Sequence, residues 1–329
     1  MRRDFFEANK AVRTAIAKHL RDYVNKEVHD NRIAEILLKR INSSAFLKGT
    51  LCYHLHGGLG GRFSRKRRAK LASALELYFS HTAYIDNVID AHYQRNGSTT
   101  LLREYGVNNH LLAALWAMHH GLKLLLKDVK CVPPQIITQY EYDKVVLAVA
   151  NENEAHSSAS DIIALMSEIY GRFTSTAFIL SAYTANASNA TVRRLGKIGS
   201  NLGIGIAIAE EIKDLLGEHG RSRAYEAELG RKGLVLQFLQ EERPSFGVQA
   251  HLGHALSETE YRHLLSACYQ SGALQKARET MVTYLRRCTR SLRSVVSSDC
   301  FHTVKTLASG MVETVDGLIE VHRSGEGMN

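Results

Sequence analysis

Residues 76–90, ELYFSHTAYIDNVID, decide which fold this chain adopts. The first part of the stretch is almost unbroken in apolar character, as in a buried helix, and two acids follow it. A helix turns about 100° per residue, so Asp86 and Asp90 lie on one side of it, one turn apart. Two carboxylates at this spacing can hold a hard divalent cation such as Mg2+. An amphipathic helix that ends in solvated acids explains the stretch equally well.

Residues 202–217, LGIGIAIAEEIKDLLG, repeat this pattern. An apolar helical run again meets acids, here Glu210, Glu211 and Asp214. Two such runs far apart in sequence predict two helices whose acids face each other across one pocket. Pyrophosphate leaves an apolar pocket only when metals and cations take up its charge, so a ligand of this kind suits the pattern.

The composition is that of a globular protein built from helices. Of the 329 residues, 45% are hydrophobic and 23% are charged, and only 3 are proline. Long segments without proline favour helices over turn-rich sheet folds, and no strand period of two persists. The five cysteines are scattered, which argues against a disulfide framework or a metal site. We predict an all-α fold in a single domain, 1–329, that ends in a frayed tail over 324–329.

Charge and hydropathy limit the partners and the compartment. No apolar run reaches the ~18 residues of a membrane span, and the start lacks the apolar segment of a secretory signal. The formal net charge of +9 leaves nucleic acid, an anionic membrane or an anionic substrate as partners. The densest basic run, 65–68, lacks the aromatic residues and motifs of nucleic-acid-binding proteins. We therefore expect a cytoplasmic protein that binds no nucleic acid.

Apolar periodicity places the helices along the chain. A long helix begins at Ser64, carries Asp86 and Asp90, and ends before the break at 96–98. The glycines at 57–61 suit a helix C-cap better than a phosphate cradle, and the polar segment 218–231 is expected to be a mobile loop. Further helices are predicted over 4–26, 31–56, 108–127, 134–153, 157–187, 191–217, 231–241, 257–294 (broken near 271–272) and 298–322.

The two acidic stretches resemble the aspartate-rich DDxxD motifs of the trans-isoprenyl diphosphate synthases, also called polyprenyl synthetases. Residues 86–90, DNVID, resemble the first motif, and residues 210–214, EEIKD, resemble the second. The resemblance covers roughly residues 40–240 and continues at Glu76, Arg95, Gly97, Tyr105, Gly106, Gly217 and the segment 228–232, ELGRK. It implies an isoprenoid synthase bundle of about ten or more helices around a deep central cavity, usually as a dimer, so we expect a homodimer.

The resemblance also implies roles for individual residues. Three Mg2+ ions would bind with the substrate, held by Asp86, Asp90, Glu210 and Asp214, with Glu211 supporting them. The diphosphate of an allylic prenyl substrate would be bound by Arg95, Lys232 and Arg172, and Lys48 would match a lysine that binds the diphosphate of isopentenyl diphosphate. The pocket for the prenyl tail would include Phe79, His81 and Thr82, which suggests a C10 to C20 chain.

The positions that bind isopentenyl diphosphate in the family differ in this chain. Leu51, Phe79 and Asn96 occupy positions where the family has cations. We therefore expect a class I enzyme, similar to terpene synthases, that ionises an allylic diphosphate and then cyclises it or passes it to another acceptor. Chain elongation, with His54 or Arg62 as replacement cations, is one alternative. A non-catalytic subunit that modulates an active synthase is another.

Overall fold

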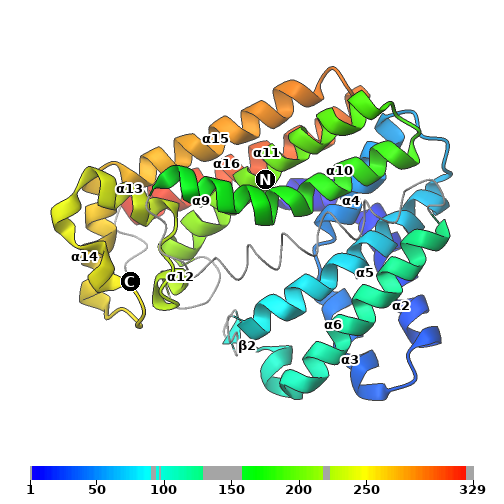
Figure 1. The fold of residues 1–329 in the computed structure, drawn as a ribbon, viewed down its shortest axis with the longest axis horizontal. Coiled ribbons are helices and arrows are strands. Elements are labelled where there is room, and N and C mark those ends of the chain that lie inside the picture. The colour runs from blue at the N-terminus through cyan, green and yellow to red at the C-terminus, as the bar shows by residue number, and fades with distance from the viewer. Residues whose placement is uncertain (1, 90–93, 96–97, 129–157, 218–222, 324–329) are drawn as a thin grey trace.

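The computed structural model describes residues 2–89, 94–95, 98–128, 158–217 and 223–323, and Figure 1 shows their arrangement. The first half forms α1 (Arg2–Ala8), α2 (Lys10–Glu27), α3 (Asn31–Ser43), α4 (Leu47–Gly58), α5 (Arg65–Ile89), strands β1 (Gln94–Arg95) and β2 (Ser98–Thr99), and α6 (Leu101–Asp128). The second half forms α9 (Ala159–Met166), the π-helical turn η1 (Ser167–Gly171), α10 (Arg172–Thr184), α11 (Asn189–Leu216), α12 (Tyr225–Glu228), α13 (Leu234–Glu242), the 3-10 turns η2 (Pro244–Phe246) and η3 (Val248–His251), α14 (Glu258–Gln270), α15 (Ala273–Leu292) and α16 (Ser298–Arg323).

Side-chain caps explain where several helices begin. The carboxylate of Asp30 accepts the backbone N–H of Ile33 at 2.9 Å at the start of α3. Ser158 and Ser257 each form a capping box with an acid three residues later, at the starts of α9 and α14. At the other end of α11, Gly217 takes a positive φ of 78°, a conformation in which glycine avoids the steric penalty of a side chain.

The all-α prediction is confirmed, with several local differences. The helix predicted over 4–26 is divided at Asn9 into α1 and α2. The helix predicted over 31–56 is broken between α3 and α4, because Phe46 adopts a left-handed backbone with φ 50°. After α5, residues 94–95 pair with residues 98–99 in a short antiparallel hairpin that periodicity did not predict. The helix predicted over 134–153 and the tail lie outside the described residues.

Two hydrophobic cores lie side by side. The N-terminal core contains buried side chains of α2, α3, α5 and α6, such as Leu75 and Ala117, and the C-terminal core contains those of α11 and α13–α16, such as Ile208 and Leu285. Figure 1 shows α10, α11, α15 and α16 running along the upper part and α2, α3, α5 and α6 lying below. The deep central cavity stays a prediction.

Helices α4 and α10 separate the two cores and contribute to both. Leu51 of α4 and Phe178 of α10 belong to the C-terminal core, whereas Cys52 and Ala177 face the N-terminal core. Because neighbouring residues on a helix point about 100° apart, each of these helices presents one face to each core. None of the described helices has the length and apolar character needed to cross a bilayer.

Candidate functional site

The end of α5 presents an acid to solvent. The turns before it are buried, including Tyr78, Phe79 and His81. Asp86 is exposed. Asp90, which was predicted to share the metal, lies outside the described residues. Of the two α5 acids that were predicted to hold the metal, the structure describes Asp86 but not Asp90.

The two polar residues one turn before Asp86 bond to their own helix. His81 Nδ1 donates to the carbonyl oxygen of Tyr78, and the hydroxyl of Thr82 donates to that of Phe79 at 2.8 Å. Burial lowers the pKa of His81, and the charge of Lys48 lowers it further. The imidazole is consequently neutral near pH 7, as in a buried core histidine. The role of His81 and Thr82 in the tail pocket stays a prediction.

Lys48, at the start of α4, lies against two aromatic rings. Its Nζ is 4.4 Å from the ring centroid of Phe79 and 4.7 Å from that of Phe173. The two rings meet edge to face, 5.6 Å apart. Cation–π attraction of this kind holds an ammonium group in one place. The structure thus brings together a predicted diphosphate ligand and a predicted tail-pocket residue, and adds Phe173 of α10, which no spacing in the sequence indicated.

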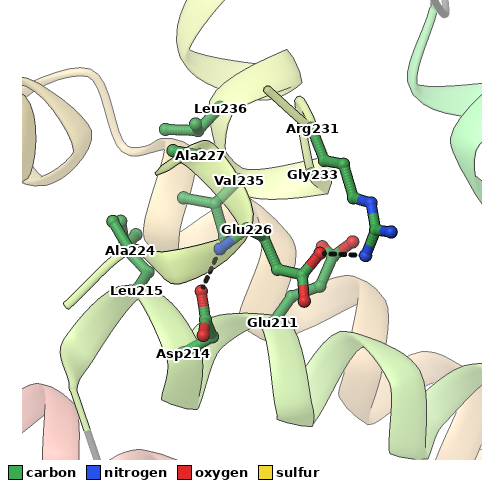
Figure 2. Close-up of a pocket in the computed structure, with 10 residues that line it drawn as sticks. All are labelled: Glu211, Asp214, Leu215, Ala224, Glu226, Ala227, Arg231, Gly233, Val235 and Leu236. Atoms are coloured by element: carbon green, nitrogen blue, oxygen red, sulfur yellow. Dashed lines mark hydrogen bonds and ion pairs between the residues drawn. The ribbon is translucent and has the colours of Figure 1, made fainter. Parts of the chain in front are cut away.

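Two acids of α11 accept hydrogen bonds from the chain that follows the helix. Asp214, which is 8% exposed, accepts the backbone N–H of Glu226 at 3.0 Å. Glu211 accepts the backbone N–H of Leu234 at 2.8 Å. Figure 2 shows these acids at a small pocket of about 30 Å³, where Arg231 also pairs with Glu226 at 3.0 Å. The described part of the segment 218–231 is bonded to α11 through Ala224 and Glu226, and its predicted mobility stays a prediction.

Glu210, the first acid of the second stretch, has a lysine as its partner. Lys213 Nζ donates to the carboxylate of Glu210 at 2.9 Å, and the lysine side chain is only 3% exposed. Sequence reasoning gave Lys213 no role. A charged residue three positions after an acid, within an apolar helical run, was nevertheless a signal for an ion pair of this kind.

The predicted diphosphate cations have partners close to them in sequence. Arg172 pairs with Glu168 one turn earlier, with Nη2 and Oε2 2.5 Å apart. Lys232 donates to Gln240 at 2.8 Å, and burial lowers its pKa. Arg95 lies in β1, and its side chain is outside the description. The grouping of these cations around one diphosphate stays a prediction.

The positions that resemble the isopentenyl diphosphate site are largely apolar or neutral. Leu51 is fully buried in the C-terminal core. His54 donates from Nε2 to the side-chain oxygen of Asn9 at 2.6 Å, and burial lowers its pKa. These contacts argue against His54 as a replacement cation, whereas Arg62 is exposed. Asn96 lies outside the described residues.

The acids of α11 have contacts within the chain. They receive backbone N–H groups or an ammonium group, and Asp86 at the end of α5 is an exposed carboxylate. Within the described ranges, no three His, Cys, Asp or Glu side chains are grouped so that they could hold a metal ion. The contacts of Glu210 and Asp214 thus give no support to a metal role, and the set of four ligands stays a prediction.

Comparison with known proteins gives matches among solved structures. No protein-family model and no curated protein matches the chain. A geranylgeranyl pyrophosphate synthetase from Pyrococcus horikoshii Ot3 matches with a TM-score of 0.82, over 94% of this chain and 98% of that one, at 15% identity. The chain has the fold of the prenyl diphosphate synthases.

Two further structures extend this likeness. A polyprenyl synthase from Caulobacter crescentus CB15, complexed with calcium and isoprenyl diphosphate, matches with a TM-score of 0.80, over 95% of this chain and 97% of that one, at 17% identity. A decaprenyl diphosphate synthase from Rhodobacter capsulatus matches with a TM-score of 0.79, over 96% and 99%, at 16% identity. The helical bundle implied by the resemblance is therefore confirmed at the level of the fold.

Proposed function

We propose that this protein is a prenyltransferase that extends an allylic prenyl diphosphate with isopentenyl diphosphate. The observation that carries the proposal is the match over nearly the whole length of prenyl diphosphate synthases. The differences at Leu51, Phe79 and Asn96 favoured a terpene synthase-like enzyme, with elongation as an alternative. The shared fold supports that alternative better, because these solved structures are named as synthases of prenyl diphosphates.

The chain's own residues suggest how the substrates would be held. Asp86, with Asp90 one turn later, would hold Mg2+, which when bound neutralises charge on the departing diphosphate. Lys48, fixed against Phe79 and Phe173, would offer a preorganised cation to the second diphosphate. The same aromatic rings would keep water away from the allylic carbon while its bond to oxygen breaks.

The test is incubation with Mg2+ and C10, C15 or C20 allylic diphosphates, with and without isopentenyl diphosphate. We expect longer prenyl diphosphates only when isopentenyl diphosphate is present, detected by mass spectrometry. Lys48→Met should raise the KM for isopentenyl diphosphate more than that for the allylic substrate, because it removes one charge-assisted contact. Lys305→Met is a control, because Lys305 is an exposed lysine of α16. Volatile products formed equally without isopentenyl diphosphate would instead support cyclisation.

A second candidate is a non-catalytic subunit that modulates an active synthase. The contacts of the α11 acids favour it, because Glu210, Glu211 and Asp214 all hold partners within the chain. This candidate expects no pyrophosphate release with any allylic chain, together with a changed rate or product length when the protein is mixed with an active prenyl diphosphate synthase. Turnover by the isolated chain would exclude it.

We further propose a homodimer that buries exposed leucines of α6. Leu112 and Leu115 are 54% and 57% exposed, and Leu111 beside them is 37% exposed. Exposed apolar residues gathered on one helix are typical of an interface with another protein. Sedimentation velocity should give a dimer for the wild type and a monomer for Leu112→Glu with Leu115→Glu. A monomeric wild type would contradict this proposal.

A further inference from the structure

Lys213 is a buried cation at the point where α11 reaches the candidate site. Its side chain is 3% exposed, in a wall that also includes Phe6, Leu47 and Met311. Burying an ammonium group is costly unless an opposite charge compensates it. Glu210, one turn earlier and 35% exposed, supplies that charge at 2.9 Å. The pair thus joins the first acid of the second motif-like stretch to a cation of the same helix.

The other two acids of α11 hold the chain that follows it. Asp214 receives the N–H of Glu226 through its carboxylate, and its carbonyl oxygen receives the N–H of Ala224 at 3.0 Å. Glu211 receives the N–H of Leu234. A Cβ atom at Gly233 would lie 3.1 Å from the Glu211 carboxylate, so a residue without a side chain permits this close approach. Figure 2 shows both carboxylates directed toward this segment.

We infer that the acids of α11 form a clamp that works without metal, in which Lys213 replaces a divalent cation. A cation that approached Glu210 would meet the Lys213 ammonium about 3 Å away, and charges of like sign repel strongly at that distance. A cation at Glu211, or at the Oδ2 of Asp214, would compete with a backbone N–H group that would then need a new partner. The clamp therefore fastens residues 224–234 to α11 without a metal ion. This inference does not depend on the proposed reaction.

The first test measures hydrogen exchange of the amides in 224–234. The clamp predicts slow exchange in the metal-free wild type, because Asp214 holds the amides of Ala224 and Glu226, Glu211 holds that of Leu234, and several amides between them bond within the segment. Asp214→Ala should speed exchange in this segment by about tenfold or more, since exchange follows local opening. Glu320→Ala removes an exposed acid of α16 and should leave the hydrogen exchange of residues 224–234 unchanged. Adding Mn2+ with inorganic pyrophosphate should not alter the protection of this segment.

Rapid exchange in the metal-free wild type would overturn the inference. So would protection of residues 224–234 that appears only when Mn2+ and pyrophosphate are added. Either result would mean that the α11 acids turn to a metal when the ligand arrives.

The second test measures Mn2+ binding, in the presence of inorganic pyrophosphate, by electron paramagnetic resonance. Glu210→Gln should keep the Mn2+ affinity of the wild type within about twofold, because this acid already has its cation. Lys213→Met keeps the length of the side chain but removes the charge, so it should raise the affinity about tenfold or create a site where the wild type has none. Loss of Mn2+ binding in Glu210→Gln, or no gain in Lys213→Met, would overturn the role of Lys213 as internal cation.

Discussion

The ends of α5 and α11 carry acids at similar spacing but in different surroundings. Asp86 on α5 is exposed, whereas Asp214 on α11 is 8% exposed and accepts a backbone N–H. On α11, Lys213 also neutralises Glu210 at short range. Acid spacing alone therefore indicates where two helices approach a site, while the donors that the fold brings to each acid decide what the acid does there.

The largest expected effect is a loss of stability when a charged side chain is placed in the C-terminal core, on the α11 side of the molecule. Leu51→Arg would place a guanidinium group in the C-terminal core, where Leu51 is fully buried. The free energy of unfolding should fall by ~3–5 kcal/mol, measured by urea denaturation, because an uncompensated buried charge is costly. Leu51→Met is the control, since it keeps the volume and should cost less than ~1.5 kcal/mol. An unchanged stability would mean that this side is as open as the end of α5.

The second prediction tests the α5 side. Asp86→Ala should slow pyrophosphate release about a hundredfold or more, because it removes a carboxylate that would hold the metal of the transition state. Its free energy of unfolding should stay within ~0.5 kcal/mol of wild type, since Asp86 is exposed. Glu320→Ala should change neither quantity. If Asp86→Ala keeps its turnover, the end of α5 is ordinary solvated surface and the comparison fails.

The third prediction sharpens the contrast with α11. Asp214→Ala should lower the free energy of unfolding by ~1–3 kcal/mol, because the N–H of Glu226 loses its acceptor. Asp214→Asn should cost less, since its amide oxygen can accept the same bond. Thermal unfolding of both variants measures the difference. Equal, wild-type stability in both would show that this acid does not hold the fold.

The smallest effect concerns pH and reaches both sides of the molecule. Burial lowers the pKa of His56, at the end of α4, and of His110, against Tyr84 of α5, to about 4. A folded-state pKa below the ordinary value of about 6.5 means that the folded protein binds fewer protons than the unfolded chain. This contribution to stability is thus complete only well above pH 6.5 and is lost as the pH falls toward 4.

Between pH 7 and pH 6 the two histidines together should account for a loss of about 1 kcal/mol. Chemical denaturation at a series of pH values measures it. His110→Phe should flatten the pH dependence, whereas His302→Asn, at an exposed position, should leave it unchanged. A His110→Phe profile as steep as that of wild type would contradict the assignment.

Local signals in the sequence predicted much of the helix order. The break expected near 271–272 lies between α14 and α15, where Gly272 has a φ of 75°. The break between α3 and α4 was missed because Phe46, not a glycine, takes the left-handed conformation there. Phe46 is buried in the N-terminal core, so long-range packing fixes a turn that local preference disfavours.

The candidate site was predictable only in part, for the same reason. Apolar patterning before Asp86 placed that acid at the exposed end of a helix. The meeting of Lys48, Phe79 and Phe173 depends on contacts among α4, α5 and α10, which lie far apart in sequence. Likewise, nothing local to α11 indicates that the N–H groups of Glu226 and Leu234 turn back onto its acids.

The double role of α4 and α10 has a consequence for cooperativity. Leu51 and Phe178 pack on one core while Cys52 and Ala177 pack on the other, so neither core can open without exposing a helix that the other needs. We expect both cores to melt in one transition. A ligand that binds Lys48 at the start of α4 would then stabilise the α11 side as much as the α5 side, because it stabilises a helix that the two share.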